Sequence, residues 1–322
     1  MKRLRILNLT PIKHIDGLEE FLSDYFEMAS FENVRKDDEI KNRDQFSGIF
    51  TNPNMSKIRL DESFLANFKS LKVVATASTG LTHIDLNYLK KRNIALISLT
   101  TDYEFINQIS STAEHAFALT LEGVRNLKAA NASVVSGHWE YLPHIGRQIN
   151  KLTFGVIGYG RLGKMYSRYV NAFGGTVLAY DPYVKVAPND NVVQLGTMKE
   201  LFEKSDVISL HAHVNPETTE FIDKNLLNKA KETLLLVNTA RGELIKESDL
   251  LEFLERNPRA KYSADVLSDE TGNLTSNPIY SSSLNTSQIF ITPHIGGMTK
   301  DAQYIAYFRT AQKLIEYFDN KV

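Results

Sequence analysis

The chain has 322 residues, of which 43% are hydrophobic and 23% charged, a balance typical of a folded globular protein. Its 37 basic and 38 acidic residues give a formal net charge of -1, which argues against nucleic acid or an anionic membrane as the main partner. The lack of cysteine excludes disulfides, thiolate metal sites and a cysteine nucleophile. No apolar run is long enough for a signal peptide or a membrane span, so we expect a cytoplasmic protein.

Short apolar runs alternate with amphipathic stretches at the start of the chain, which predicts a parallel sheet covered by helices. The expected strands are Arg5–Leu9, Gly48–Thr51, Leu71–Ala77 and Ile94–Leu99, and the expected helices are Gly17–Phe26 and Ile84–Arg92. Further along, apolar residues at helical spacing predict one long helix from Ser110 to about Ser136. Its length suits a bridge between two domains.

A second alternating series then supplies the strands of a complete doubly wound domain. The expected strands are Leu152–Ile157, Thr176–Tyr180, Val207–His211, Leu234–Asn238, Tyr262–Val266 and Ile289–Thr292. The expected helices are Leu162–Phe173, Met198–Lys204, Glu247–Glu255 and, at the end of the chain, Thr299–Phe318.

A glycine-rich turn follows the first strand of this second series. Its residues are Gly158, Tyr159, Gly160, Arg161, Leu162 and Gly163. In a dinucleotide-binding turn the first glycine permits the tight bend, the second lets the backbone approach a pyrophosphate, and the third lets helix and strand pack closely. The helix N-terminus supplies N–H groups and a positive dipole end to the phosphates. The same spacing also occurs in turns that bind nothing, so the residues around the turn must decide whether it binds a dinucleotide.

Asp181 ends the next strand, close to the expected position of the carboxylate that holds the ribose hydroxyls. A carboxylate there repels a 2′-phosphate, and Pro182 and Tyr183 offer no cation to receive one. We therefore expect NAD as the cofactor, although Lys185 is near enough in sequence to leave NADP open.

Other distinctive stretches lie before and after the glycine turn. They are Ser78–Asp85, Ala113–Ala116, Asn238–Gly242, Ala264–Glu270 and Thr292–Gly297. In this order and at this spacing, the chain resembles the D-isomer-specific 2-hydroxyacid dehydrogenases, the family that includes phosphoglycerate dehydrogenase and D-lactate dehydrogenase. The resemblance implies an α/β protein of two doubly wound domains, a flavodoxin-like substrate-binding domain (residues 1–102 and 296–322) and a Rossmann NAD-binding domain (residues 103–295). It also implies a homodimer through the NAD-binding domain and the long helix.

The resemblance assigns Arg241 to the substrate carboxylate, His294 to general acid–base catalysis, and Glu270 to a pair with His294. A guanidinium binds a planar carboxylate bidentately, and an imidazolium protonates the alkoxide that hydride delivery creates. A neighbouring carboxylate favours the protonated imidazole and orients it. Taken singly, each residue also has a plainer explanation. Arg241 would suit a surface ion pair, and His294 would suit a structural role. Glu270 lies in a polar loop, where Asp269 is the alternative candidate for the pair with His294.

The resemblance implies further contacts, with the substrate at Thr79, Gly80 and Leu81 and with the nicotinamide at Thr239, Ala240 and Asp265. The first three match a loop whose backbone N–H groups meet the substrate carboxylate, and Asp265 matches the residue that holds the carboxamide. His211 and His213 have metal-ligand spacing, but no third ligand is evident, so we expect no metal. For His83 and His115, packing roles are favoured.

The substrate itself stays open within the class of small 2-oxo and 2-hydroxy acids. Asn52 and Asn54 suggest a neutral polar pocket, while Lys57 and Arg59 leave a phosphorylated substrate open. The chain ends soon after His294, so we expect no appended regulatory domain of the kind found in some phosphoglycerate dehydrogenases. The leading hypothesis is a 2-oxo acid reductase. The alternative is an NAD-sensing binding protein, like the corepressors that resemble this family.

Overall fold

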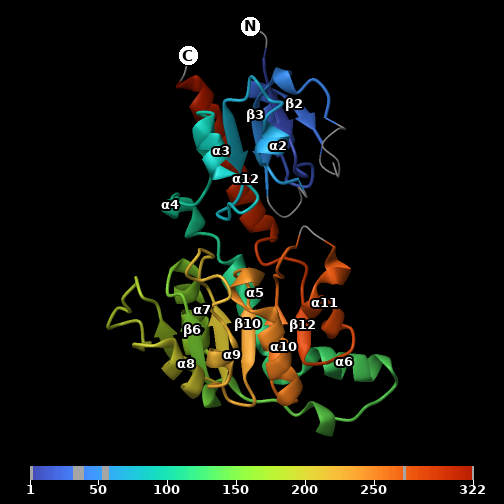
Figure 1. Cartoon of the computed structure of the whole chain (residues 1–322), viewed down its shortest axis with the longest axis vertical. Helices are drawn as coiled ribbons and strands as arrows, with labels where there is room; N and C mark the ends of the chain where they lie inside the picture. Colours follow the sequence, from blue (N-terminus) through green and yellow to red (C-terminus); the bar gives the residue numbers. More distant parts are fainter. Residues whose placement is uncertain (1–2, 32–39, 53–57, 271–272, 321–322) are drawn as a thin grey trace. The chain divides into compact units, whose positions relative to one another are not determined.

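The computed structural model describes residues 3–31, 40–52, 58–270 and 273–320 (Figure 1). The chain divides into two compact units, of which the first comprises Met1–Ile109 with Met298–Val322 and the second comprises Ser110–Gly297. Each unit is built on its own parallel sheet with its own hydrophobic core. No helix in the described ranges combines the length and apolarity needed to cross a membrane.

The described residues of the first unit form a parallel sheet of five strands in the order β2-β1-β3-β4-β5. The strands are β1 (Leu4–Asn8), β2 (Phe26–Ser30), β3 (Phe46–Thr51), β4 (Val73–Thr76) and β5 (Ala95–Ile97). This is the flavodoxin-like strand order, which confirms that part of the predicted fold. Strand β2 was not predicted, because it follows the preceding helix without a turn and its first residue, Phe26, completes the apolar pattern of that helix.

Helices cover both faces of the first sheet. They are α1 (Leu18–Tyr25), α2 (Glu62–Leu65), α3 (Leu86–Lys91), α4 (Tyr103–Ile106) and α12 (Lys300–Asp319), with the 3-10 turn η2 (Arg43–Gln45). Because strand side chains alternate between faces, Ile6 packs in the core under α1 and α12, whereas Leu7 packs in the core under α2 and α3. The last helix of the chain thus completes the first unit.

In the second unit, the described residues form seven parallel strands in the order β12-β11-β10-β9-β6-β7-β8. The strands are β6 (Thr153–Ile157), β7 (Thr176–Tyr180), β8 (Val193–Gln194), β9 (Val207–Leu210), β10 (Leu235–Asn238), β11 (Lys261–Ala264) and β12 (Ile289–Ile291). Counted from β6, this is the Rossmann order with one strand added beyond β11. The prediction of six strands omitted β8, which is exposed and too short to carry a pattern.

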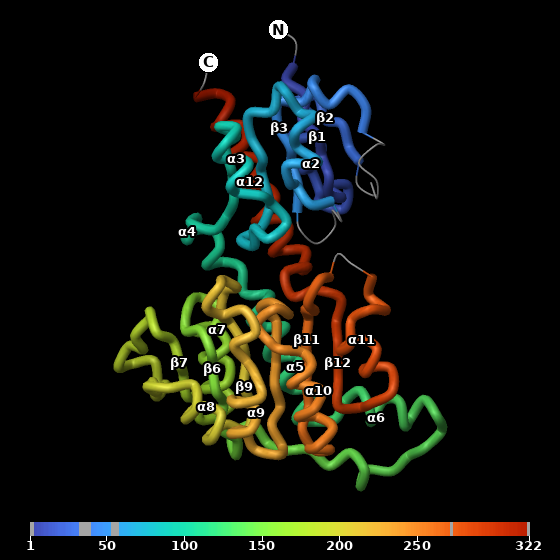
Figure 2. The backbone as a smooth tube through the Cα atoms, viewed as in Figure 1, coloured from blue at the N-terminus to red at the C-terminus, as the bar shows by residue number. Residues whose placement is uncertain are grey.

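The described residues of the second unit form seven helices, of which all but α6 pack in the cores on the two faces of the sheet (Figure 2). They are α5 (Ser111–Arg125), α6 (Leu127–Val135), α7 (Arg161–Ala172), α8 (Met198–Lys204), α9 (Lys224–Leu227), α10 (Glu247–Arg256) and α11 (Pro278–Ser283). The 3-10 turns are η3 (Leu142–His144), η4 (Ile149–Lys151), η5 (Gly242–Leu244) and η6 (Leu274–Ser276). Helices α5 and α7 share one core around Phe117 and Tyr166, and α8 to α11 share the other.

The prediction of one long helix from Ser110 to about Ser136 is wrong, because the helix breaks at Asn126. This residue has a left-handed backbone with φ 56, a conformation that asparagine adopts more readily than most residues. Its side chain accepts a hydrogen bond from Lys261, and its amide donates to the Ile145 carbonyl at 3.1 Å. The break directs α6 away as a separate helix with no buried residue.

Candidate active site

The glycine turn lies between β6 and α7, and two of its glycines hold the shape of the turn itself. Gly158 has φ 89, and a Cβ there would lie 2.7 Å from the carbonyl group of His211, where β9 ends. A Cβ on Gly163 would lie 2.1 Å from the carbonyl oxygen of Gly158. Helix and strand therefore meet in direct backbone contact, which no side chain at either position would permit.

Gly160 differs from its neighbours, because no described atom lies within 4 Å of the position a Cβ would take. It is the N-cap of α7, and as a glycine it has no side chain to occupy the N–H groups of Arg161, Leu162 and Gly163. Open space at the positive end of a helix dipole suits an anionic pyrophosphate. The turn therefore fits a dinucleotide.

Asp181 directly follows β7 and is held by three backbone N–H groups. Its Oδ2 accepts from the N–H of Tyr159 at 2.7 Å, and its Oδ1 accepts from those of Tyr183 and Val184 at 2.8 and 2.9 Å. The Tyr159 side chain is buried, and burial together with its hydrogen bond to Asp190 raises the pKa of its hydroxyl. The Asp181 carboxylate is thus fixed beside the glycine turn.

Asn238, the last residue of β10, shapes the loop that carries Thr239, Ala240 and Arg241. Its side-chain carbonyl accepts from the N–H of Ala240 at 3.0 Å, and its amide donates to the carbonyl of Arg241 at 2.9 Å. Thr239 is only 6% exposed, and its buried hydroxyl has no hydrogen-bond partner among the described residues. Leaving such a group unpaired costs about 1–3 kcal/mol, so the position fits a polar ligand group such as the nicotinamide.

Arg241 lies at the carboxyl end of β10 and is half-buried, with its Nη1 donating to the Ala240 carbonyl at 2.6 Å. A Cβ on the next residue, Gly242, would lie 2.1 Å from the backbone of Leu267 and Ser268. The loop that follows β10 therefore packs directly against the loop that follows β11.

Glu270 lies at the end of that second loop and pairs with His294, which follows β12. The carboxylate Oε2 is 2.6 Å from Nδ1 of the imidazole, and Oε1 accepts from the N–H of Leu267 at 3.0 Å. Because an ionised carboxylate only accepts, this contact suits a histidine that carries a proton on Nδ1. The two side chains are 34% and 27% exposed, so the pair is fixed yet open to small molecules. Asp269, the competing neighbour, takes a left-handed turn with φ 52.

Asp265 is 2% exposed and holds the segment that carries His294. Its carboxylate accepts from the N–H groups of Ile295 and Gly296 at 2.9 and 2.7 Å and from the Thr292 hydroxyl at 2.5 Å. Burial alone would raise the pKa of Asp265, but these bonds and one from His115 outweigh it and lower the pKa below its ordinary value. The predicted nicotinamide residue is therefore an ionised anchor of the histidine segment.

His115 and Thr292 complete this cluster, and neither was assigned to the site from the sequence. Nε2 of His115 lies 2.9 Å from the Thr292 hydroxyl and 3.3 Å from Oδ1 of Asp265. A packing role was favoured for His115, whose ring instead makes polar contacts. Both residues lie in stretches that carry the family resemblance, which was the available signal.

The predicted substrate residues of the first unit lie at the carboxyl ends of β3 and β4. Asn52 is 3% exposed, and its amide donates to the Ala77 carbonyl at 3.4 Å. The loop Thr79–Leu81 is more open, and its N–H groups make no hydrogen bond to another described residue. The N–H groups of this loop suit an anion. Asn52, in contrast, is enclosed by the protein. Asn54 and Lys57 lie outside the described residues.

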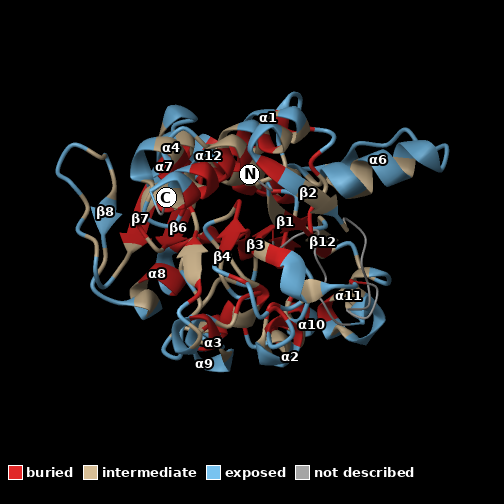
Figure 3. Ribbon diagram, turned by 90° about the horizontal axis from the view of Figure 1, so that it is seen from above, coloured by how far each residue is buried: buried red, intermediate tan, exposed pale blue. Residues whose placement is uncertain are grey.

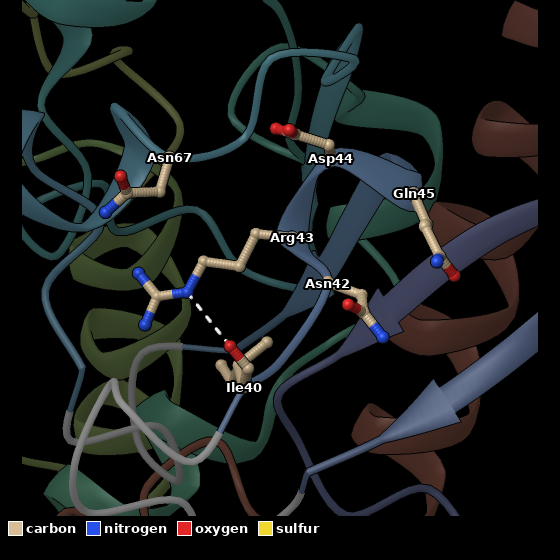
Figure 4. Close-up of a pocket in the computed structure, with 6 residues that line it drawn as sticks. All are labelled: Ile40, Asn42, Arg43, Asp44, Gln45 and Asn67. Atoms are coloured by element: carbon tan, nitrogen blue, oxygen red, sulfur yellow. Dashed lines mark hydrogen bonds between the residues drawn. The ribbon is translucent and has the colours of Figure 1, made fainter.

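An open pocket of about 400 Å³ lies elsewhere on the first unit (Figure 4). It is lined by Ile40, Asn42, Arg43, Asp44, Gln45 and Asn67. The Arg43 side chain crosses it and donates from Nε to the Ile40 carbonyl at 3.1 Å. This pocket precedes β3 and is therefore at the amino edge of the sheet, whereas ligands of open α/β sheets bind at the carboxyl edge. None of the predicted site residues lies in it.

The part of the chain that the structure describes contains no group of three or more His, Asp or Glu side chains that could hold a metal ion. His211 donates or accepts through Nε2 at 2.9 Å from the Ser209 hydroxyl, and burial lowers its pKa to about 3, so it is neutral. His213, two residues on, is exposed.

Comparison with known proteins identifies the family to which the chain belongs. The sequence model of the D-isomer specific 2-hydroxyacid dehydrogenase NAD binding domain matches residues 117–296, more than half of the chain. The chain belongs to this family of oxidoreductases, as the sequence resemblance predicted.

Two curated relatives and one solved structure show how far the similarity extends along the chain. D-3-phosphoglycerate dehydrogenase of Mycobacterium tuberculosis is 34% identical over 77% of this chain and 45% of its own length. The Bacillus subtilis enzyme of the same name is 29% identical over 94% of this chain and 55% of its length. The chain thus spans about half the length of these curated relatives. Among solved structures, D-lactate dehydrogenase from Aquifex aeolicus, complexed with NAD and lactic acid, is 28% identical with a TM-score of 0.83, covering 98% of this chain and 96% of that one.

Proposed function

We propose that this protein transfers a hydride reversibly between NAD(H) and a small 2-oxo or 2-hydroxy acid. The observation that carries the proposal is the pair of His294 and Glu270, 2.6 Å apart, beside the arginine loop of the adjacent strand. Arg241, Glu270 and His294 follow three neighbouring strands of one parallel sheet, β10, β11 and β12, and so share its carboxyl edge. Ligands of open α/β sheets bind at this edge.

Each residue has a chemical task in the proposed reaction. NADH, when bound, would supply a hydride to the carbonyl carbon of the 2-oxo acid. Arg241 binds the planar carboxylate through its guanidinium. As the carbonyl oxygen gains the electron pair of its double bond, His294 gives it a proton from Nε2. Glu270 holds Nδ1–H and balances the charge of the imidazolium.

We also propose NAD, not NADP, as the cofactor. The Asp181 carboxylate is fixed by Tyr159, Tyr183 and Val184 on the adenosine side of the glycine turn. An immobile negative charge there repels a 2′-phosphate. The nicotinamide end would be held near Thr239, whose orphan hydroxyl supports a polar ligand, with Ala240 and Asp265 beside it.

Relatives favour the substrate class but leave the particular acid open. The names of the relatives include D-3-phosphoglycerate dehydrogenase, D-lactate dehydrogenase and glyoxylate reductase. The glyoxylate reductase, from Paecilomyes thermophila, is 25% identical with a TM-score of 0.82, covering 98% of this chain and 95% of that one. All these substrates share a 2-oxo or 2-hydroxy carboxylate. Arg59, the one described candidate for a phosphate contact, is exposed.

The test is NADH oxidation by the purified chain with pyruvate, glyoxylate and 3-phosphohydroxypyruvate as separate substrates. We expect turnover with at least one of them. Arg241→Ala should lower kcat/KM by about 10³-fold or more while the NADH Kd stays within about threefold, because the lost contact is to substrate. Arg241→Lys is the matched control and should recover only part, since lysine lacks the bidentate fork. Tight NADH binding without any turnover would instead indicate an NAD-sensing binding protein.

We further propose a homodimer formed through the segment that begins with α6. Seven large apolar side chains in the described part of this segment are at least half exposed. They are Leu127, Val134, Val135, Trp139, Tyr141, Leu142 and Ile145. Figure 3 shows α6 exposed along most of its length. Monomers rarely leave so many apolar residues together in water, and a second copy of the chain would cover them.

A further inference from the structure

His115 lies in the first turns of α5, with its side chain 18% exposed. Its Nε2 faces two oxygens, the Thr292 hydroxyl at 2.9 Å and Oδ1 of Asp265 at 3.3 Å. A histidine that served only to fill the core would not need a buried carboxylate as its neighbour. The proposed reaction gives this residue no task.

The cluster around His115 connects three elements of the second unit. His115 belongs to α5, Asp265 follows β11, and Thr292 opens the segment after β12. Asp265 binds that segment again through the N–H groups of Ile295 and Gly296. The packing is close, since a Cβ on Gly296 would lie 3.0 Å from the Asp265 carboxylate and 3.7 Å from the His115 ring. The cluster therefore encloses the backbone on both sides of His294.

The backbone of His294 needs such support. It has φ 54, a left-handed conformation that is strained for a residue other than glycine. Its N–H donates to the carbonyls of Asp265 and Thr292 at 2.9 and 3.0 Å. A strained residue keeps one conformation only where its neighbours fix it, and here the neighbours include the partners of His115.

We propose that His115 is a positioning residue, which, with Asp265 and Thr292, holds His294 in the left-handed conformation that brings its imidazole to Glu270. The proposal rests on the proposed function for its catalytic consequence. Two histidine–carboxylate pairs thus lie in series. The outer pair, His294 with Glu270, exchanges the proton with the substrate. The inner pair, His115 with Asp265, fixes the segment that carries His294. Asp265 belongs to the inner pair in addition to any contact with the cofactor.

The test compares His115→Phe, which keeps the ring shape but removes the polar contact, with His115→Gln, whose amide reaches a similar position. Displacing a catalytic group by about 1 Å costs up to ~10²-fold, so we expect His115→Phe to lower kcat about 10–100-fold with the NADH Kd within about threefold. His115→Gln should recover to within about threefold of the wild type. Ser263→Ala is the matched control, because Ser263 also joins α5 to β11, by donating to Glu122 at 3.3 Å, but does not touch the His294 segment.

A second readout does not depend on turnover. An NMR ¹H–¹⁵N spectrum of the imidazole groups reports the Nδ1–H that Glu270 holds. The signal of His294 is assigned as the one that disappears in a His294 variant. We expect His115→Phe to shift or broaden this signal, and His115→Gln and Ser263→Ala to leave it in place. If His115→Phe does not fold, Thr292→Val removes the bridging hydroxyl at constant shape and should show the same effects.

The outcomes separate the two claims. A shifted His294 signal in a chain that reduces no 2-oxo acid would leave the positioning role standing and overturn the proposed function. Turnover in the wild type together with an unchanged His294 signal and kcat in His115→Phe would overturn the positioning role alone. An equal loss of kcat in Ser263→Ala would also overturn it, because docking of α5 would then be the cause.

Discussion

Two glycines of one turn should respond in opposite ways to the same added methyl group. At Gly163 a Cβ would lie 2.1 Å from the Gly158 carbonyl oxygen, so α7 must move away from β6. At Gly160 no described atom lies within 4 Å of the added Cβ, and its φ of -76° suits alanine. We therefore expect Gly163→Ala to damage the protein itself and Gly160→Ala to damage only cofactor binding.

The magnitudes follow from the geometry. Overpacking a tight contact costs about 1–3 kcal/mol. For a domain of this size each kcal/mol lowers the Tm by about 2–4 °C, so Gly163→Ala should lose about 2–12 °C. Gly160→Ala should change the free energy of unfolding by less than about 1 kcal/mol, because no contact is strained. A methyl group in the space proposed for the pyrophosphate should weaken NADH at least ~10-fold, or ~1.4 kcal/mol.

Thermal unfolding with and without NADH measures both effects. At about 100 times the wild-type Kd, the ligand should stabilise the wild type by about 2.7 kcal/mol and Gly160→Ala by about 1.4 kcal/mol or less. A Gly160→Ala variant that binds NADH as tightly as the wild type would refute the assignment of this turn to the pyrophosphate. A Gly163→Ala variant with an unchanged Tm would refute the packing argument.

Three further predictions address the acid–base pair, the stability of the first unit and the dimer. Glu270→Gln keeps the contact with Leu267 but removes the negative charge beside His294, so kcat should fall about 10–100-fold in steady-state assays with the NADH Kd unchanged. Asp102 is 10% exposed and accepts from Arg309 and Lys313 at 2.8 and 3.3 Å; burial raises its pKa, but these bonds lower it overall. The stabilisation that goes with a lowered pKa is fully present above the ordinary aspartate value and is lost as pH falls through the lowered pKa. In urea unfolding, Asp102→Asn should therefore cost about 1–3 kcal/mol at about pH 7 and less at about pH 3. An equal cost at both pH values would contradict this. Trp139→Ser should shift the mass measured by light scattering from dimer toward monomer, and an unchanged mass would exclude this residue from the interface.

The sequence predicted those parts of the fold whose signals are local and repeated. Buried strands such as β7 and amphipathic helices such as α8 carry apolar periodicity, and both were predicted with their observed bounds. Strand β2 was missed because it follows its helix without a turn signal, and only its pairing with β1 separates the two. The break at Asn126 was missed because it depends on contacts with Lys261 and Ile145.

The site shows the same limit. The family resemblance singled out Glu270 and His294, and the structure brings the two within hydrogen-bond distance. Spacing could not indicate that Asn52 is enclosed, because its burial depends on elements from elsewhere in the chain. Nor could it indicate that His115 and Thr292, which lie 177 residues apart, meet at Asp265.

The central claim is that this chain moves a hydride between NADH and carbon 2 of a 2-oxo acid. The most direct measurement uses NADH deuterated at C4 of the nicotinamide and follows the label by mass spectrometry. We expect deuterium at C2 of the 2-hydroxy acid formed, at a rate that falls about 10²–10⁴-fold in His294→Asn while NADH still binds. Bound NADH whose label never reaches any of the 2-oxo acids would contradict the claim and leave a protein that binds the cofactor without using it.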